Sequence, residues 1–146
     1  MVIRIDGDGC PDIKIMEQIA EEYLIPMVVY TDSDHNISLS YAHVDVTDTG
    51  CQNVDIKLSN EILNGDIVVT QDYGVAVIAL SKKAKVIHPK GHEYTDDNIM
   101  MMLSEKHENQ KLRRRHQHVK GPKKRTKEDT ERLCETLVKV IEQNRS

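Results

Sequence analysis

Short runs of β-branched residues alternate along this chain with segments in which apolar residues recur at helical spacing. The runs predict strands over 2–5, 27–30, 44–46, 67–70 and 86–88. Strands that alternate with helices form a mainly parallel sheet with helices on both faces. The nearly continuous apolar character of these strands fits burial on both sides. The pattern therefore predicts an α/β fold, a three-layer α/β/α sandwich.

Three segments between the strands have the character of helices. Segment 13–23 is amphipathic and is expected to form a helix with Pro11 in its first turn. Segment 54–62 is expected to form a second helix that ends before Gly65. Segment 75–80 is apolar throughout, and its place between two strands favours a buried helix.

The last third of the chain has a different pattern. Thr95 is expected to cap a helix with two acids in its first turn. The stretch 111–127 contains nine Lys or Arg residues and no Asp or Glu, and it predicts a basic connector. Thr126 is then expected to cap a C-terminal helix over about 126–143, with one apolar stripe. At 146 residues, a single domain over 1–146 is expected.

Charge and composition narrow the class of protein. The formal net charge is −4, although 111–127 alone carries +9. Such a strip on an acidic protein is either a solvated connector or a contact for a phosphate-rich partner. The three cysteines are widely spaced and form no Cys-x-x-Cys pair, and no apolar run approaches the roughly 20 residues of a spanning helix. We expect a cytoplasmic protein with reduced thiols and no membrane contact.

Four acidic residues are expected to meet at one edge of the sheet. Asp6 and Asp8 end the first strand, Asp72 follows the strand 67–70, and Asp55 lies in the first turn of the helix after the third strand. Ligands of open α/β sheets bind outside the carboxyl ends of the strands. Because like charges repel unless a cation lies between them, the set predicts a Mg²⁺ or Mn²⁺ site. The alternative is that these acids lie in solvated turns and cap helices.

A carboxylate-held metal of this type supports phosphoryl chemistry without a protein nucleophile. Asp6, Asp8 and Asp72 are the expected catalytic residues, with Asp55 as a further metal ligand. The expected partner is a nucleic acid, whose phosphates would contact Arg113, Arg114, Lys120, Lys123, Lys124 and Arg125. His116 and His118 form a His-x-His pair, but the surrounding positive charge opposes cation binding there.

Three stretches of the chain carry a resemblance to a known family. Residues 6–11 read Asp-Gly-Asp-Gly-Cys-Pro, residues 65–72 read Gly-Asp-Ile-Val-Val-Thr-Gln-Asp, and residues 88–95 contain His-Pro-Lys-Gly. These stretches, with the later Gly-Pro at 121–122, resemble the uncharacterised bacterial YaiI/YqxD family over nearly the whole chain. One departure is Gln52, because the family block before the second helix often carries two acids three residues apart.

The family is similar to PIN-like nuclease domains, in which acids at the ends of the first and fourth strands bind Mg²⁺ or Mn²⁺. This resemblance implies a PIN-like fold, a metal-dependent nuclease or phosphodiesterase acting on RNA, and a role for the Thr70 hydroxyl in orienting an acid or a metal-bound water. That step rests on analogy, since function lies in the site and not in the fold.

Two alternatives remain open at this stage. One is a non-catalytic nucleic-acid-binding or ribosome-associated module that uses the basic strip and keeps its acids for stability. The other is a haloacid-dehalogenase-like phosphatase, in which Asp6 and Asp8 would be nucleophile and acid. The sequence disfavours that phosphatase, because its only Asp-Asp pair, at 96–97, begins a helix and does not follow a strand.

Overall fold

A computed structural model describes residues 1–32, 37–47, 54–115 and 124–145. Their six strands are β1 (Ile3–Asp6), β2 (Met27–Asp32), β3 (His43–Thr47), β4 (Ile67–Val69), β5 (Lys85–Ile87) and β6 (Glu93–Tyr94). Their five helices are α1 (Ile13–Glu22), α2 (Val54–Glu61), α3 (Tyr73–Ser81), α4 (Asp96–Arg114) and α5 (Lys127–Arg145). The sheet has the order β3-β2-β1-β4-β5-β6, and only the β5–β6 pairing is antiparallel. The expected mainly parallel α/β fold is confirmed.

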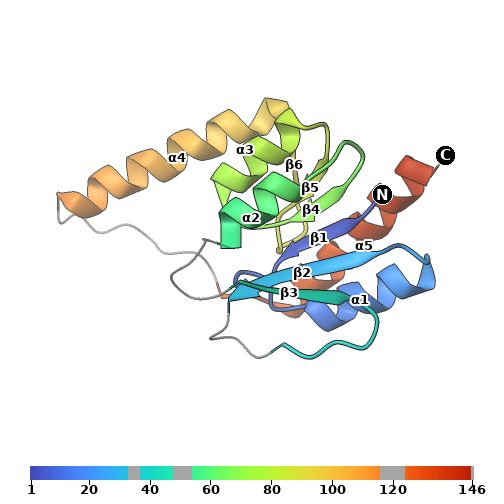
Figure 1. Cartoon of the computed structure of the whole chain (residues 1–146). Coiled ribbons are helices and arrows are strands. Elements are labelled where there is room, and N and C mark those ends of the chain that lie inside the picture. The colour runs from blue at the N-terminus through green and yellow to red at the C-terminus, as the bar shows by residue number, and fades with distance from the viewer. Residues whose placement is uncertain (33–36, 48–53, 116–123, 146) are drawn as a thin grey trace.

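Helices cover both faces of the sheet (Figure 1). On one face, α1 and α5 pack against β1, β2, β4 and β5 through a cluster that includes Ile3, Ile5, Met16, Leu133 and Leu137. On the other face, α2, α3 and α4 pack against the sheet through a second cluster that includes Tyr30, Leu58, Val68, Ala76 and Ile99. The central strands are therefore buried on both sides, as their apolar runs predict.

Two helices differ in detail from the expectation. Helix α3 is a helix as predicted, but Val77 and Ile78 are each 40% exposed, so it is buried along only part of its surface. Helix α1 begins at Ile13 with Asp12 as its N-cap, so Pro11 precedes the helix instead of lying in its first turn. Cys134, on the apolar side of α5, is partly buried. The five described helices include none with the length and apolar character needed to cross a membrane.

The main corrections concern β6 and α4. The sequence analysis missed β6, a two-residue strand too short to show any periodicity. Because β6 is antiparallel to β5, the chain reverses there, and α4 runs back toward the carboxyl ends of the parallel strands. Helix α4 also extends to Arg114, so the first part of the expected connector is helical. In Figure 1 the second half of α4 projects past the body of the domain.

A buried ion pair joins the amino ends of β1 and β4. The Arg4 Nε donates to Asp66 Oδ2 at 2.7 Å, and Arg4 Nη1 donates to the Tyr30 hydroxyl at 2.6 Å. Asp66, 2% exposed, also accepts from the backbone nitrogens of Val2 and Leu63. The carboxylate thus satisfies one buried cation and two backbone groups at once.

We expect Asp66→Ala to lower the free energy of unfolding by about 3–5 kcal/mol, because it leaves the Arg4 guanidinium buried without its counter-charge. Urea denaturation measures the change. Glu21→Ala, on the exposed surface of α1, is the control and should change stability by no more than about 0.5 kcal/mol. A loss below about 1 kcal/mol for Asp66→Ala would show that the pair is not a structural requirement.

Candidate functional site

The strand order places a switch point between β1 and β4. From β1 the chain adds β2 and β3 on one side, and then crosses to build β4 and β5 on the other. Ile5 pairs with Val69, so the residues that follow them leave the sheet at the same level. Ligands of open α/β sheets bind outside the carboxyl ends of the strands at such a point. The side chains there are the natural candidates for a functional site.

Asp6 is the innermost acid of this edge. It is the last residue of β1 and is 6% exposed. Its Oδ2 accepts from the Thr70 hydroxyl at 3.2 Å, and its Oδ1 accepts from the backbone nitrogen of Asp8 at 3.3 Å. Burial raises the pKa of Asp6, and the charges of Asp8 and Asp72 raise it further, while the two hydrogen bonds lower it. The Thr70 hydroxyl therefore contacts one of the four acids.

Asp8 is held at the same edge by the end of β2. Its Oδ1 accepts from the Thr31 hydroxyl at 3.2 Å. The Gly7 nitrogen donates to the Tyr30 carbonyl at 2.7 Å, and a Cβ on Gly7 would lie only 2.7 Å from that same oxygen. A side chain at Gly7 would thus push the Asp6–Asp8 turn away from β2. The N-cap of the following helix is Asp12, so the interpretation in which Asp6 or Asp8 caps that helix is wrong.

Asp72 has a capping role of its own. It is the N-cap of α3, and its Oδ1 accepts from the Val75 nitrogen at 3.0 Å. Its own backbone nitrogen donates to the Thr70 hydroxyl at 3.0 Å. Thr70 therefore donates to Asp6 and accepts from Asp72, and this links the ends of β1 and β4.

Asp55 joins the group from the first turn of α2. Its pKa is raised to about 6, first by burial, then by a side-chain hydrogen bond with Asp72, and then by the charges of Asp6, Asp72 and Asp8. A carboxyl group that hydrogen-bonds another carboxylate does so by keeping its proton. The structure thus brings all four predicted acids into mutual electrostatic range, and a protonated Asp55 can donate a hydrogen bond to Asp72.

The donor chemistry of these four groups fits a small, hard cation, because all are carboxylates. Among the described residues, however, no three His, Cys, Asp or Glu side chains are spaced as a ready-made metal site. The acids instead bond Thr31, Thr70, the Val75 nitrogen and one another. A cation bound by these carboxylates would favour the ionised form of Asp55.

Cys10 lies near the acids but belongs to the core. It is 6% exposed, and its thiol donates to the Val69 carbonyl with an S–O distance of 3.7 Å. Burial, with the charge of Asp6, holds the pKa of the thiol above its ordinary range. A protonated, buried thiol is a poor nucleophile.

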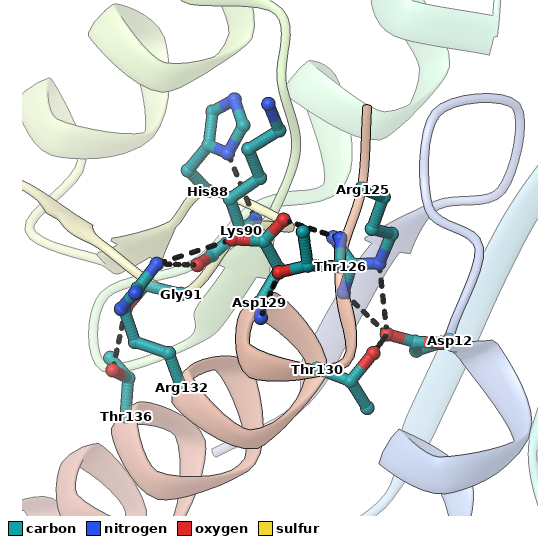
Figure 2. Close-up of polar contacts among 10 residues, drawn as sticks. All are labelled: Asp12, His88, Lys90, Gly91, Arg125, Thr126, Asp129, Thr130, Arg132 and Thr136. Carbon is teal, nitrogen blue, oxygen red and sulfur yellow. Dashed lines mark hydrogen bonds and ion pairs between the residues drawn. The ribbon is translucent and has the colours of Figure 1, made fainter. Parts of the chain in front are cut away.

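The structure separates the predicted nucleic-acid contacts. Arg113 and Arg114 are exposed in the last turn of α4, and Lys124 is also exposed. The guanidinium of Arg125 is bound by the Asp12 carboxylate, which also accepts from the Thr130 hydroxyl (Figure 2). Several residues lie outside the described ranges: Gln52, His116, His118, Lys120 and Lys123.

The contacts of Arg125 belong to the anchorage of α5 (Figure 2). Thr126 and Asp129 form a capping box, with side chain-to-backbone bonds of 3.3 and 2.9 Å. Arg132 donates to the Lys90 carbonyl, and the Thr136 hydroxyl donates to the Gly91 carbonyl. The amino end of α5 is thereby fixed to α1 and to the β5–β6 turn. Arg125 is therefore engaged in a structural contact.

Three residues of this edge were missed by the sequence analysis. Thr31 contacts Asp8, and its place at the end of a predicted strand could have identified it. The Gln71 side chain donates to the Gly9 carbonyl at 3.2 Å and so links the two acidic loops. Tyr94 is 1% exposed, and its hydroxyl has no hydrogen-bond partner within the described ranges. Burial, Tyr73 and Asp72 raise the pKa of Tyr94. No sequence signal marks Tyr94, because β6 itself was missed.

The raised pKa of Asp55 predicts a pH-dependent stability in EDTA. A pKa of about 6, against an ordinary 3.8, means that the folded state binds more protons than the unfolded state in this range, so stability falls as pH rises from about 4 to about 7. Asp55→Asn should show a smaller loss of stability over this pH range. At pH 7 its free energy of unfolding should exceed that of wild type by up to about 1 kcal/mol, because solvent screens this partly exposed group. Thermal melts across pH measure it, with Asp97→Asn on α4 as the control. An unchanged pH slope for Asp55→Asn would contradict the raised pKa of Asp55.

Comparison with known proteins assigns the chain to a family. A UPF0178 protein from Clostridium kluyveri is 45% identical over 141 residues, 97% of this chain and 93% of that protein. A UPF0178 protein from Clostridium acetobutylicum is 45% identical over 97% of each chain. A UPF0178 protein from Natranaerobius thermophilus is 44% identical over 88% of each chain. No solved structure matches significantly. Because the model of the uncharacterised YaiI/YqxD family matches residues 4–143, the chain belongs to that family.

Proposed function

We propose that this protein is a metal-dependent phosphodiesterase that acts on RNA. One observation carries the proposal: four carboxylates from three sequence-distant segments meet at the switch point of the sheet, where burial and the neighbouring charges raise the pKa values of Asp6 and Asp55. Such clustering of perturbed acids is typical of functional sites. A purely structural edge would gain nothing from this repulsion.

Each residue would have a distinct part. Asp6, Asp8 and Asp72 would hold Mg²⁺ or Mn²⁺, and Asp55 would join them after losing its proton. When bound, such an ion polarises a phosphoryl oxygen and lowers the pKa of bound water. Thr70 would hold the Asp6 carboxylate and the Asp72 backbone in register through its two hydrogen bonds. The PIN-like resemblance supports the same assignment by analogy.

The choice of RNA rests on charge. An acidic edge repels phosphates, so a polyanionic substrate needs cations nearby. Arg113 and Arg114 are exposed at the end of α4, the helix that runs toward this edge. Within the part of the chain that the structure describes, neither side chain makes a contact like the one between Arg125 and Asp12.

A non-catalytic nucleic-acid-binding module is the second candidate. It is favoured by the absence of a ready-made metal cluster among the described residues and by the capping role of Asp72. The phosphatase alternative has less support, because Asp96 begins α4 beside Lys83 and Lys85, at the amino ends of the parallel strands. That position is at the opposite edge of the sheet from Asp6.

A thermal-shift titration tests the metal site. At Mn²⁺ tenfold above its Kd, binding to the native state should add about 1.4 kcal/mol, a rise in Tm of about 4 °C for a domain of this size. Asp6→Asn and Asp72→Asn should lose this shift, and an asparagine at position 72 can still accept from the Val75 nitrogen. Asp97→Asn, which also removes an acid from a helix start, should keep the wild-type shift.

Cleavage of a labelled single-stranded RNA in Mn²⁺ is then measured with the same variants. We expect wild type and Asp97→Asn to cleave, and Asp6→Asn and Asp72→Asn to be at least about 100-fold slower. A wild-type metal shift without any cleavage would favour the non-catalytic module. Equal metal shifts in wild type and both site variants would overturn the metal assignment.

A further inference from the structure

A groove of about 400 Å³ lies directly beside the acidic edge. Gln71 and Tyr73, the two neighbours of Asp72, line one side of it, and α4 lines the other with Met102, Lys106, Asn109 and Arg113. We call it the α4 groove. Its volume is in the range of pockets that hold small organic ligands.

The fold explains why these residues meet. The β6 reversal sends α4 toward the carboxyl ends of the strands. Positions 102, 106, 109 and 113 are three or four residues apart, so they share one side of the helix. The Gln71 amide also bonds the Gly9 carbonyl in the loop after Asp8. The α4 groove therefore lies next to the acidic edge, with Gln71 and Tyr73 on either side of Asp72 in the chain.

The lining combines an aromatic ring with positive charge. The Lys106 ammonium lies over the ring of Tyr73, 5.3 Å from its centroid. That ring is partly exposed, and an edge-to-face contact with Tyr94, with centroids 5.9 Å apart, fixes its orientation. Lys106 and Arg113 are both exposed, and Glu105 is the one acid among the lining residues, which leaves a net positive charge.

An aromatic ring flanked by cations is the arrangement that binds unpaired nucleotides, because bases stack on the ring and phosphates contact the cations. We propose that the α4 groove binds the nucleotide of single-stranded RNA next to the phosphate at Asp72, with its base against Tyr73 and flanking phosphates at Lys106 and Arg113. Lys106 leaves the ring face as the base arrives. This inference rests on the proposed function, to which it adds the substrate's position.

Fluorescence anisotropy with a labelled mixed-sequence octaribonucleotide tests the groove in EDTA, so that neither metal nor cleavage is required. Lys106→Gln combined with Arg113→Gln should weaken binding about tenfold. It should also reduce the slope of log K against log salt by about 1.4, since each phosphate of a single strand contributes about 0.7. Lys14→Gln combined with Lys139→Gln is the matched control, because both lysines are exposed on the opposite helical layer. That control should bind as wild type.

Tyr73 is tested separately. Tyr73→Phe should keep the wild-type affinity, because the ring remains, whereas Tyr73→Leu should lose about tenfold. Melting curves show whether either variant is folded. If Tyr73→Leu does not fold, the variants of the exposed Lys106 and Arg113 still test the proposal. If wild type does not bind the RNA, or if the groove and control variants lose affinity equally, the proposal that the α4 groove binds RNA is wrong.

The outcomes for the groove and the metal site are distinguishable. Suppose that the groove variants bind RNA more weakly and that wild type shows no Mn²⁺-induced thermal shift. This result would support the RNA-binding role of the α4 groove and contradict the proposed metal-dependent chemistry. A Mn²⁺-induced thermal shift that depends on Asp6 and Asp72, with unchanged RNA binding by the groove variants, would give the opposite result. It would support the metal site and contradict RNA binding in the α4 groove.

Discussion

The burial of the Asp6 carboxylate at the end of β1 constrains everything around it. A buried negative charge is costly unless it is hydrogen-bonded or neutralised. Thr70 and the Asp8 nitrogen satisfy the oxygens of Asp6, but Asp8, Asp55 and Asp72 add further negative charge at the same edge. In the metal-free protein this repulsion contributes to the raised pKa values of Asp6 and Asp55, so Asp55 takes up a proton when the pH falls to about 6. A divalent cation would relieve the repulsion more completely, and this is the physical basis of the proposed metal site.

The fold could largely be predicted from the sequence, for a physical reason. Parallel strands buried on both faces must be apolar throughout, so runs such as 67–69 are visible without any alignment. The meeting of Asp6 and Asp72 could also be predicted, because the carboxyl ends of parallel strands share one edge. Part of the family resemblance, in residues 6–11 and 65–72, lies at this edge, and the family match over residues 4–143 confirms the assignment. The PIN-like relationship and the metal remain predictions.

What could not be predicted depends on contacts between distant segments or on very short elements. Arg125 belongs to a basic strip in the sequence, but 113 positions separate it from the Asp12 carboxylate that binds it. Strand β6 has only two residues, yet it reverses the chain and sets the direction of α4. Without β6, neither the buried Tyr94 nor the groove beside Tyr73 could be placed. A basic strip therefore indicates a charge and not the partner of each side chain.

The proposed metal site at the acidic edge is tested most directly by a crystal structure of the protein grown with Mn²⁺ and recorded at a wavelength where manganese scatters anomalously. We expect an anomalous peak bounded by the carboxylates of Asp6, Asp8 and Asp72, at about 2.1 Å from their oxygens. Asp55 should then have released its hydrogen bond to Asp72. An acidic edge without a peak, in which Asp55 still bonds Asp72 at saturating Mn²⁺, would contradict the metal site.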